Sequence, residues 1–271
     1  MFTYARCEEL ATPTHAALAA ARAEKVFGVP YSVRRHRARA RAMAPFGEAE
    51  SWLDVDTGHG HFPAVAREVH PYTAFDGLDP TERVEEGRRA GRVEEAHLGL
   101  LADLAPKLAG RYDVLSMFHY LERSEDPRIE LIAARTVLRP GGHLMIEVPV
   151  PRSRYARLLA KGWLRPGPDH PRPGPHQPLP GHHHDIPLCA LRRDLESLGY
   201  TVVATERRES HIPFDLAAGL ALALGRIRAT ARVAAPLLAA AALADRLLAP
   251  LVGRTRFSNA YRIIARRGPK K

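Results

Sequence analysis

A short apolar run followed by a polar, glycine-bearing turn is the first segment whose residues could do chemistry. Residues 51–55 read SWLDV, and residues 56–60 read DTGHG. A strand, a glycine turn and a helix start together let a ligand approach backbone amides, where the helix dipole favours a carboxylate or a phosphate. A dinucleotide fold would need G-x-G-x-x-G, but Pro63 occupies the third glycine position. The turn therefore predicts a site for an anionic group and disfavours nicotinamide.

An acidic residue follows the next apolar run. Residues 73–78 form a second predicted strand, and Asp79 and Pro80 come directly after it. An acid at the C-terminal end of that strand can accept hydrogen bonds from both hydroxyls of a ribose. Asp79 could equally cap the helix predicted over residues 81–90. The residues alone leave both interpretations open.

A histidine stands after a later predicted strand, residues 112–117. Phe118, His119 and Tyr120 follow that strand in sequence. A histidine side chain suits proton transfer near neutral pH. His119 could therefore act as a general base, or it could only line a pocket.

The elements that must position these residues alternate between strand and helix. The predicted strands are residues 51–55, 73–78, 95–101, 112–117, 143–150, 201–206 and 260–265. The predicted helices between them are residues 62–69, 81–90, 127–138 and 186–198, and RPGG at 139–142 breaks the third. Such alternation implies right-handed crossovers and a mostly parallel sheet.

Composition excludes several classes of protein. Hydrophobic residues make up 45% and charged residues 26%, which favours a sizeable core over global disorder. Cys7 and Cys189 are the only cysteines, which excludes a disulfide scaffold and a cysteine-rich metal site. No apolar run reaches about 18 residues, so no membrane-spanning helix is predicted.

The net charge of +10 indicates either an anionic partner or a bias in composition. Most of the basic residues are arginine, and alanine is abundant. Both are typical of a GC-rich coding sequence, so we favour compositional drift over a nucleic-acid, phospholipid or acidic partner.

Four segments, in this order and spacing, resemble the class I S-adenosylmethionine-dependent methyltransferases. LDVDTGHGHF (53–62) resembles the family's glycine motif, LDVGxGxGxF, and GLDP (77–80) its ribose-binding turn. YDVLSMFHYLERSEDP (112–127) and LRPGGHLMIEVP (138–149) resemble the segments around the fourth and fifth strands. The resemblance covers about residues 34–205, and residues 260–265 match the reversed last strand. It implies an α/β, Rossmann-like sheet of seven strands, six parallel and the last antiparallel, with helices on both faces.

The resemblance implies S-adenosylmethionine as cofactor and assigns residues to it. The residues it places against the cofactor are Asp54, Asp56, Thr57, Gly58, Gly60, Asp79, Pro80, Leu100, Leu101, Met117, Phe118 and His119. Asp79 would take the ribose hydroxyls, and Leu100 and Leu101 would flank the adenine. His119 is the predicted catalytic base, and Tyr120, His182 and His184 are predicted to bind substrate. We expect no metal, because the histidine-rich loop before residue 185 lacks paired cysteines and helical spacing.

Two residues depart from the family's pattern. Asp56 stands where its first glycine is expected, and Arg123 replaces the histidine of its usual Leu-Glu-His. A side chain at position 56 crowds the backbone approach, and its charge opposes the cofactor's carboxylate. On this view Asp56→Gly should raise cofactor affinity. A methyltransferase-like scaffold that binds ligand or catalyses cyclisation remains the alternative.

The sequence predicts three regions. Residues 1–48 form an N-terminal helical cap, residues 49–212 with 254–271 form the cofactor-binding core, and residues 213–253 form a helical insertion. Residues 34–41 carry five arginines, which predicts a solvated helix, although one arginine could reach the cofactor's carboxylate. Residues 233–244 are apolar on every side, so we predict a cap over an apolar substrate. A homodimer contact and a peripheral membrane contact are the alternatives for this segment.

The whole sequence predicts an enzyme that methylates a small, apolar or bulky molecule, with oxygen slightly preferred as the acceptor atom. The N-terminal residues 1–27 lack a basic stretch followed by an apolar run, so we expect a cytoplasmic protein. DNA is not an expected partner. An RNA methyltransferase is a rival prediction, which the absence of a recognisable RNA-binding module disfavours.

Overall fold

The computed structural model describes residues 33–150, 184–208 and 260–269, together with residues 220, 236–241, 243, 244 and 247. His182 and most of the predicted insertion, residues 213–253, lie outside the described residues. The strands are β1 (Ser51–Val55), β2 (Ala74–Asp79), β3 (Ala96–Leu98), β4 (Tyr112–Phe118), β5 (Leu138–Pro149), β6 (Tyr200–Arg208) and β7 (Ala260–Arg267). The helices are residues 33–41 (the N-terminal helix), α2 (His61–Ala66), α3 (Arg83–Arg89), α4 (Leu101–Leu104), α5 (Pro127–Val137) and α7 (Leu188–Ser197). Short 3₁₀ turns occur at η2 (Ala44–Phe46) and η3 (Leu121–Arg123).

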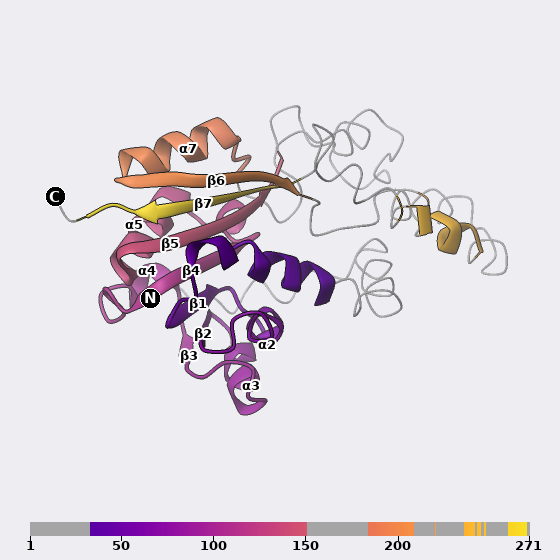
Figure 1. The fold of residues 1–271 in the computed structure, drawn as a ribbon, viewed down its shortest axis with the longest axis horizontal. Helices are drawn as coiled ribbons and strands as arrows, with labels where there is room; N and C mark the ends of the chain where they lie inside the picture. The colour runs from indigo at the N-terminus through magenta and orange to yellow at the C-terminus, as the bar shows by residue number, and fades with distance from the viewer. Residues whose placement is uncertain are drawn as a thin grey trace, which may run out of the picture.

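The seven strands form one sheet in the order β3-β2-β1-β4-β5-β7-β6 (Figure 1). Strands β1 to β5 are parallel to one another, whereas β7 is antiparallel to both of its neighbours, β5 and β6. The predicted sheet of six parallel strands and one reversed strand is confirmed. The strand order reverses direction between β1 and β4, and ligands in open α/β sheets bind at such a switch point, beyond the carboxyl ends of the strands.

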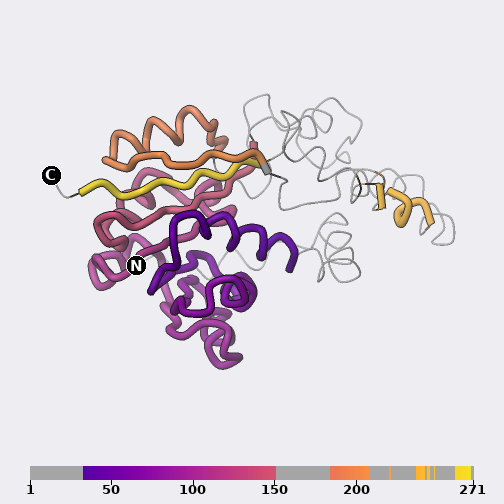
Figure 2. The backbone as a smooth tube through the Cα atoms, in the orientation of Figure 1, coloured from indigo at the N-terminus to yellow at the C-terminus, as the bar shows by residue number. Residues whose placement is uncertain are grey.

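Helices cover both faces of the sheet, as predicted. Apolar side chains of α4, α5 and α7, including Leu101, Leu131 and Leu195, form one core with one face of the strands. The N-terminal helix and α2 form a second core on the other face, around Trp52 and Phe75. In Figures 1 and 2 the N-terminal helix, drawn in indigo, lies in front of the sheet, with α4 and α5 behind it. Among the residues that the structure describes, no helix is long and apolar enough to cross a membrane.

The boundaries of two predicted strands are wrong. The third was predicted over residues 95–101, but β3 ends at Leu98, because Gly99 adopts a φ of 146° and Leu101 begins α4. The fifth was predicted to begin at residue 143, whereas β5 begins at Leu138 and includes the RPGG turn. An apolar run alone does not distinguish a strand from the start of a buried helix.

The register of the sheet brings its carboxyl ends to one level. Val55 pairs with Leu78 and with Met117, so the next residues, Asp56, Asp79 and Phe118, are neighbours across β1, β2 and β4. The same level continues through further paired residues, namely Leu98 on β3, Glu147 on β5, Arg262 on β7 and Glu206 on β6. At this level of the sheet, charged side chains therefore lie on β2, β5, β6 and β7 and directly after β1.

A chain of polar side chains crosses the sheet below this edge. The Ser116 hydroxyl donates to Asp54 Oδ1 at 2.5 Å, and Trp52 Nε1 donates to Ser116 Oγ at 2.9 Å. Asp54 is only 3% exposed. Burial raises the pKa of Asp54 to about 7, although the hydrogen bond from Ser116 opposes the shift.

The raised pKa of Asp54 predicts a pH-dependent stability effect. The native protein binds the Asp54 proton more tightly than the unfolded chain does. The protonated Asp54 therefore contributes to the stability of the folded state at low pH, and this contribution is lost as the pH rises toward 7. Asp54→Asn should therefore stabilise the protein at pH 8, by about 3 kcal/mol in the free energy of unfolding. Most of this gain should disappear at pH 5, and asparagine can still accept from Ser116.

Denaturant unfolding at pH 5 and pH 8 measures this effect. The matched control is Asp126→Asn, which changes an exposed carboxylate at the start of α5 that asparagine can replace as a cap. A gain from Asp54→Asn of equal size at both pH values would contradict the prediction.

Candidate functional site

The glycine turn (residues 56–60) lies between β1 and α2 at the switch point of the sheet. Asp56, Gly58 and Gly60 all have left-handed backbones, with φ of 59°, 56° and 73°. A Cβ atom on Gly60 would lie 3.1 Å from Arg92 Cβ, so glycine is required there for space as well as conformation. A Cβ atom on Gly58 would meet no atom within 4 Å. The turn therefore has open space beside Gly58.

Asp79 holds the glycine turn from the neighbouring strand. Its Oδ2 accepts a hydrogen bond from Gly58 N at 2.9 Å, and its Oδ1 accepts from the Thr81 amide at 2.9 Å and the Thr81 hydroxyl at 2.5 Å. The side chain is fully buried. Asp79 thus organises the loop before α3 but does not cap that helix, because the N-cap residue is Glu82 and no side chain caps it. A carboxylate oxygen has two lone pairs, so Oδ2 retains one acceptor site, and the predicted ribose contact stays a prediction.

The two departures from the family's pattern contact each other. Arg123 Nη2 forms an ion pair with Asp56 Oδ2, and Arg123 Nε donates to the carbonyl oxygen of His119 at 2.6 Å. Burial raises the pKa of Asp56, and the Arg123 guanidinium opposes this shift. The pair joins the glycine turn after β1 to η3 after β4, across the switch point.

His119 is held by four contacts at the end of β4. Its amide donates to the carbonyl oxygen of Glu147 at 2.8 Å, and its own carbonyl accepts from Arg123. Its ring lies between two buried carboxylates, with Nδ1 3.2 Å from Glu122 Oε1 and Nε2 3.4 Å from Glu147 Oε1. The φ of His119 is 57°, a left-handed value that few residues other than glycine adopt. Such a conformation persists only where surrounding contacts enforce it, and it is typical of functional sites.

Glu147 is the centre of a buried charge cluster, which we call the Glu147 cluster (Glu147, Arg39, Arg262 and His119). Arg39 Nη2 lies 2.5 Å from Glu147 Oε1, and Arg262 Nη2 lies 2.9 Å from Glu147 Oε2. Burial alone would raise the pKa of Glu147, but the Arg39 guanidinium, with His119 and Arg262, holds it well below its usual range. Arg39 Cζ also lies 4.1 Å from the centre of the Phe118 ring. This cluster joins the N-terminal helix to β4, β5 and β7.

The prediction of a solvated arginine helix is wrong for Arg39, which is 3% exposed. The sequence prediction also missed Glu122, Glu147 and Arg262. A signal was present for two of them, because Glu147 interrupts the apolar run at 144–148 and Arg262 interrupts the run at 260–265. A lone charge in a buried strand must have a partner, although the sequence does not say which.

The other predicted site residues lie in different surroundings. Leu101 and Met117 are fully buried in the core, whereas Leu100 is 43% exposed. Thr57 is buried, and Pro80 is exposed. Tyr120 is half-buried, and its pKa is raised by burial and by Glu130.

His184 lies against the segment after β4. Its amide donates to the carbonyl oxygen of Glu122 at 3.1 Å, and its Nε2 lies 3.0 Å from the carbonyl oxygen of Glu125. The structure therefore brings His184 next to η3, near the elements that carry His119 and Tyr120. Its predicted role in substrate binding stays a prediction.

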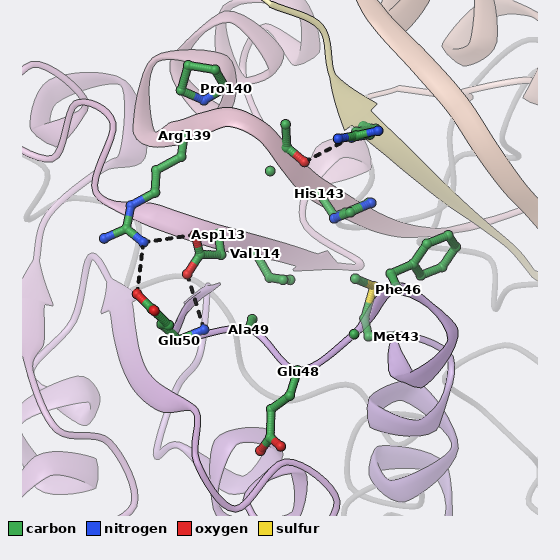
Figure 3. A pocket seen from close by; sticks show the side chains of 14 residues that line it. Met43, Phe46, Glu48, Ala49, Glu50, Asp113, Val114, Arg139, Pro140 and His143 are labelled. Atoms are coloured by element: carbon green, nitrogen blue, oxygen red, sulfur yellow. Dashed lines mark hydrogen bonds and ion pairs between the residues drawn. The ribbon is translucent and has the colours of Figure 1, made fainter.

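A pocket of about 440 Å³ lies at the opposite edge of the sheet (Figure 3). It is lined by the starts of β4 and β5 and by the residues that follow the N-terminal helix. Arg139 in its wall pairs with Asp113 at 2.9 Å and with Glu50 at 3.5 Å. The rings of Phe46 and His143 are 5.0 Å apart. None of the predicted site residues lines this pocket, so it is separate from the site at the carboxyl ends of the strands.

Asp76, Glu95 and His97 are close enough together to resemble a metal site. However, Arg111 forms an ion pair with Glu95 and lies 3.7 Å from Asp76 Oδ2. The Tyr112 hydroxyl also donates to Asp76 Oδ2 at 2.6 Å. A guanidinium and a hydroxyl thus already satisfy these carboxylates, and the group carries no argument for a metal.

The sequence matches a family model described as "Methyltransferase domain" over residues 24–205. No curated protein sequence matches the chain significantly.

Several solved structures share the fold. A S-adenosylmethionine-dependent methyltransferase from Archaeoglobus fulgidus is 17% identical, with a TM-score of 0.56, and the match covers 92% of this chain and 99% of that one. The [4+2]-cyclase SpnF is 16% identical, with a TM-score of 0.56 and coverage of 87% and 82%. An O-methyltransferase family protein from Burkholderia thailandensis is 18% identical, with a TM-score of 0.51 and coverage of 94% and 63%. At these identities the likeness concerns the fold alone. Because the family model spans most of the chain, the protein belongs to the methyltransferase-domain family and has the class I S-adenosylmethionine-dependent methyltransferase fold.

Proposed function

We propose that this protein transfers the methyl group of S-adenosylmethionine to a hydroxyl group of a small molecule, with His119 as general base. The observation that carries the proposal is the position of His119. Its left-handed backbone and its ring lie at the same sheet edge as the glycine turn and Asp79, beside the switch point. The family's reaction needs a nucleophile aligned with an activated carbon at this place.

The described residues fit the cofactor that the family implies. The left-handed glycine turn leaves open space beside Gly58, and the fully buried Asp79 holds the turn in this form through its bond to the Gly58 amide. Leu100 offers an exposed apolar side chain after β3. The glycine turn and Asp79 would hold the nucleoside and its amino-acid end. When bound, the cofactor supplies a methyl group on a positively charged sulfur, which needs no further activation by the protein.

His119 is the candidate base, and its ring must turn away from Glu147 before Nε2 can take a proton from an acceptor hydroxyl, because Nε2 is buried 3.4 Å from Glu147 Oε1. Glu122 Oε1 accepts from Nδ1–H in the tautomer that leaves Nε2 as the basic atom. The imidazolium that forms then lies between the Glu122 and Glu147 carboxylates, which stabilise its charge. Glu147 itself is fixed by Arg39 and Arg262, so it acts as an oriented charge and not as a second base. Glu122 is a positioning residue in this scheme.

An apolar or bulky acceptor is part of the proposal. It is supported by the apolar composition of residues 233–244, of which Leu237 and Leu243 are exposed. A group that removes a proton is needed for a hydroxyl acceptor, and His119 provides one. Because a hydroxyl acceptor must lose its proton to a base, a histidine at this position favours oxygen as the acceptor atom.

A second candidate function is a reaction without methyl transfer, such as cyclisation. The specific observation in its favour is the Asp56–Arg123 ion pair, which crosses the switch point where a cofactor would lie. The similarity to SpnF, described as a [4+2]-cyclase, supports the idea that this fold accommodates such chemistry. Calorimetry with S-adenosylmethionine distinguishes the two functions, because absence of binding heat and of a thermal shift would favour the second.

Replacing His119 should abolish proton transfer without abolishing cofactor binding. We expect His119→Ala to lower kcat by about 100-fold or more with a phenol or alcohol acceptor. The measurement is release of S-adenosylhomocysteine with a panel of small phenols, alcohols and amines. His143→Ala, at the opposite edge of the sheet, is the control and should retain activity. Glu122→Gln should shift the pH–rate profile, an effect that a purely structural role would not produce.

Activity in His119→Ala equal to that of the native protein, at every pH tested, would remove His119 from the mechanism. Methylation of amines alone would instead argue against a hydroxyl acceptor.

Asp79 should couple the stability of the glycine turn to cofactor affinity. Asp79→Asn places an amide donor against either Gly58 N–H or the Thr81 donors, so one hydrogen bond to a charged acceptor is lost. We expect a loss of about 1–3 kcal/mol in the free energy of unfolding and a weaker Kd for S-adenosylhomocysteine. Denaturant unfolding and calorimetry measure the two effects. Asp194→Asn, an exposed member of an ion pair with Arg128, is the control, and an unchanged Kd in Asp79→Asn would refute the predicted cofactor contact.

A further inference from the structure

We propose that Asp56 and Arg123 together bind the zwitterionic amino-acid end of the cofactor, with Arg123 on its carboxylate and Asp56 on its ammonium group. The inference rests on the proposed function, because it concerns the same site. It assigns a binding role to the two residues that depart from the family's pattern, which the sequence alone indicated as obstacles to the cofactor.

The backbone at position 56 has kept the conformation that a glycine would adopt. Asp56 has a φ of 59°, and aspartate is one of the few residues that tolerate this left-handed region. The backbone of the turn can therefore follow the same path as with glycine at position 56, and the aspartate adds only a carboxylate to it. Its side chain is only 18% exposed and is directed to Arg123, across the switch point between β1 and β4.

Arg123 is fixed in place by two contacts. Its Nε donates to the carbonyl oxygen of His119 at 2.6 Å, and its Nη2 pairs with Asp56 Oδ2. A guanidinium has five N–H donors, so these contacts leave others available. Within the described part of the chain, Arg123 Nη1 and Asp56 Oδ1 make no hydrogen bond. The guanidinium is also 45% exposed, so a ligand can reach it.

The charges of the pair match those of an α-amino acid. When a ligand carries both an ammonium and a carboxylate group, its carboxylate can take the place of Asp56 beside Arg123, and its ammonium group can take the place of Arg123 beside Asp56. A ligand that carries only one of these groups leaves either Asp56 or Arg123 without a counter-charge. Charge-assisted hydrogen bonds of this kind are stronger than neutral ones, and Arg123 can offer a carboxylate two parallel N–H groups.

The rival explanation is that the pair is only a clip that fastens the glycine turn to η3. A clip supports the site as a whole, so its loss should affect every adenosyl ligand alike. A receptor for the zwitterion should affect only those ligands that carry the amino-acid group. The two explanations therefore predict different results with ligands of the same nucleoside.

Calorimetry with S-adenosylhomocysteine and 5′-methylthioadenosine separates these explanations, because the second ligand keeps the nucleoside and thioether but lacks the amino-acid end. We expect Arg123→Gln and Asp56→Asn each to weaken S-adenosylhomocysteine binding by about 10- to 100-fold. The same variants should bind 5′-methylthioadenosine as the native protein does. Arg88→Ala removes an exposed arginine paired with Glu85 on α3, and it should leave both affinities unchanged.

A ligand without the carboxylate assigns the two roles separately. Decarboxylated S-adenosylmethionine keeps the ammonium group, so Asp56→Asn should still weaken its binding, whereas Arg123→Gln removes a guanidinium that this ligand leaves without a counter-charge and should leave its affinity unchanged or raise it. Thermal denaturation followed by circular dichroism shows whether each variant is folded. Arg123→Lys, which keeps the charge but not the fork of donors, provides a milder variant, and its loss of affinity should be intermediate.

Equal losses for S-adenosylhomocysteine and 5′-methylthioadenosine would overturn the inference in favour of a clip. A gain of affinity for S-adenosylhomocysteine in either variant, or no change in it, would also overturn the inference while leaving the proposed function in place. If the native protein bound neither ligand, both the inference and the proposed function would fail.

Discussion

The burial of the Glu147 carboxylate is the interaction on which the arrangement of the site depends. Moving a carboxylate out of water costs several kcal/mol, and this cost is offset only when counter-charges and hydrogen bonds surround the group. Glu147 obtains them from Arg39 on the N-terminal helix, from Arg262 on β7 and from His119 after β4. Three segments that are distant in sequence must therefore meet at the end of β5. The position of His119 therefore follows from the need to neutralise the buried Glu147 carboxylate.

The same edge of the sheet shows how a second charge is tolerated. Asp56 carries a carboxylate into a turn where its neighbours include the fully buried Asp79. Arg83 lies 3.7 Å from Asp79 Oδ1, and Arg123 pairs with Asp56, so each acid has its own guanidinium. Without Arg123, two like charges would share one poorly hydrated loop. The arginine at position 123 therefore accounts for the aspartate at position 56, and neither substitution is explained by itself.

Much of the fold could be predicted from the sequence, because it depends on local patterns. Alternating strand and helix patterns predicted the mostly parallel sheet, the family resemblance implied its reversed last strand, and RPGG at 139–142 correctly marked the end of α5. The alternation of strand and helix patterns gave the wrong boundary for β3, where no local signal marks the end of the strand. An apolar run could not show that Gly99 ends β3 and that Leu101 begins a helix.

The candidate site was less predictable, because its charges are paired over long distances in the chain. Asp56 and Arg123 were each recognised as departures, but no local pattern indicates that two residues so far apart form an ion pair. Arg39 is one of five arginines in a helix, and only the position of Glu147 makes it the buried one. Sequence patterns show which residues are unusual, whereas tertiary structure decides which of them neutralise each other.

Arg123 makes the two halves of the site depend on each other. One guanidinium holds both the Asp56 carboxylate and the carbonyl oxygen of His119. The backbone of His119 is left-handed. It is held by the hydrogen bond that its carbonyl oxygen accepts from Arg123 and by the one that its N–H donates to the carbonyl oxygen of Glu147. A ligand group that attracts the guanidinium away from Asp56 therefore also acts on the contact that holds the backbone of His119. In the proposed function, the position of His119 therefore depends on the contacts of Arg123 as well as on β4, so the glycine turn and the end of β4 should not be treated as independent parts of the site.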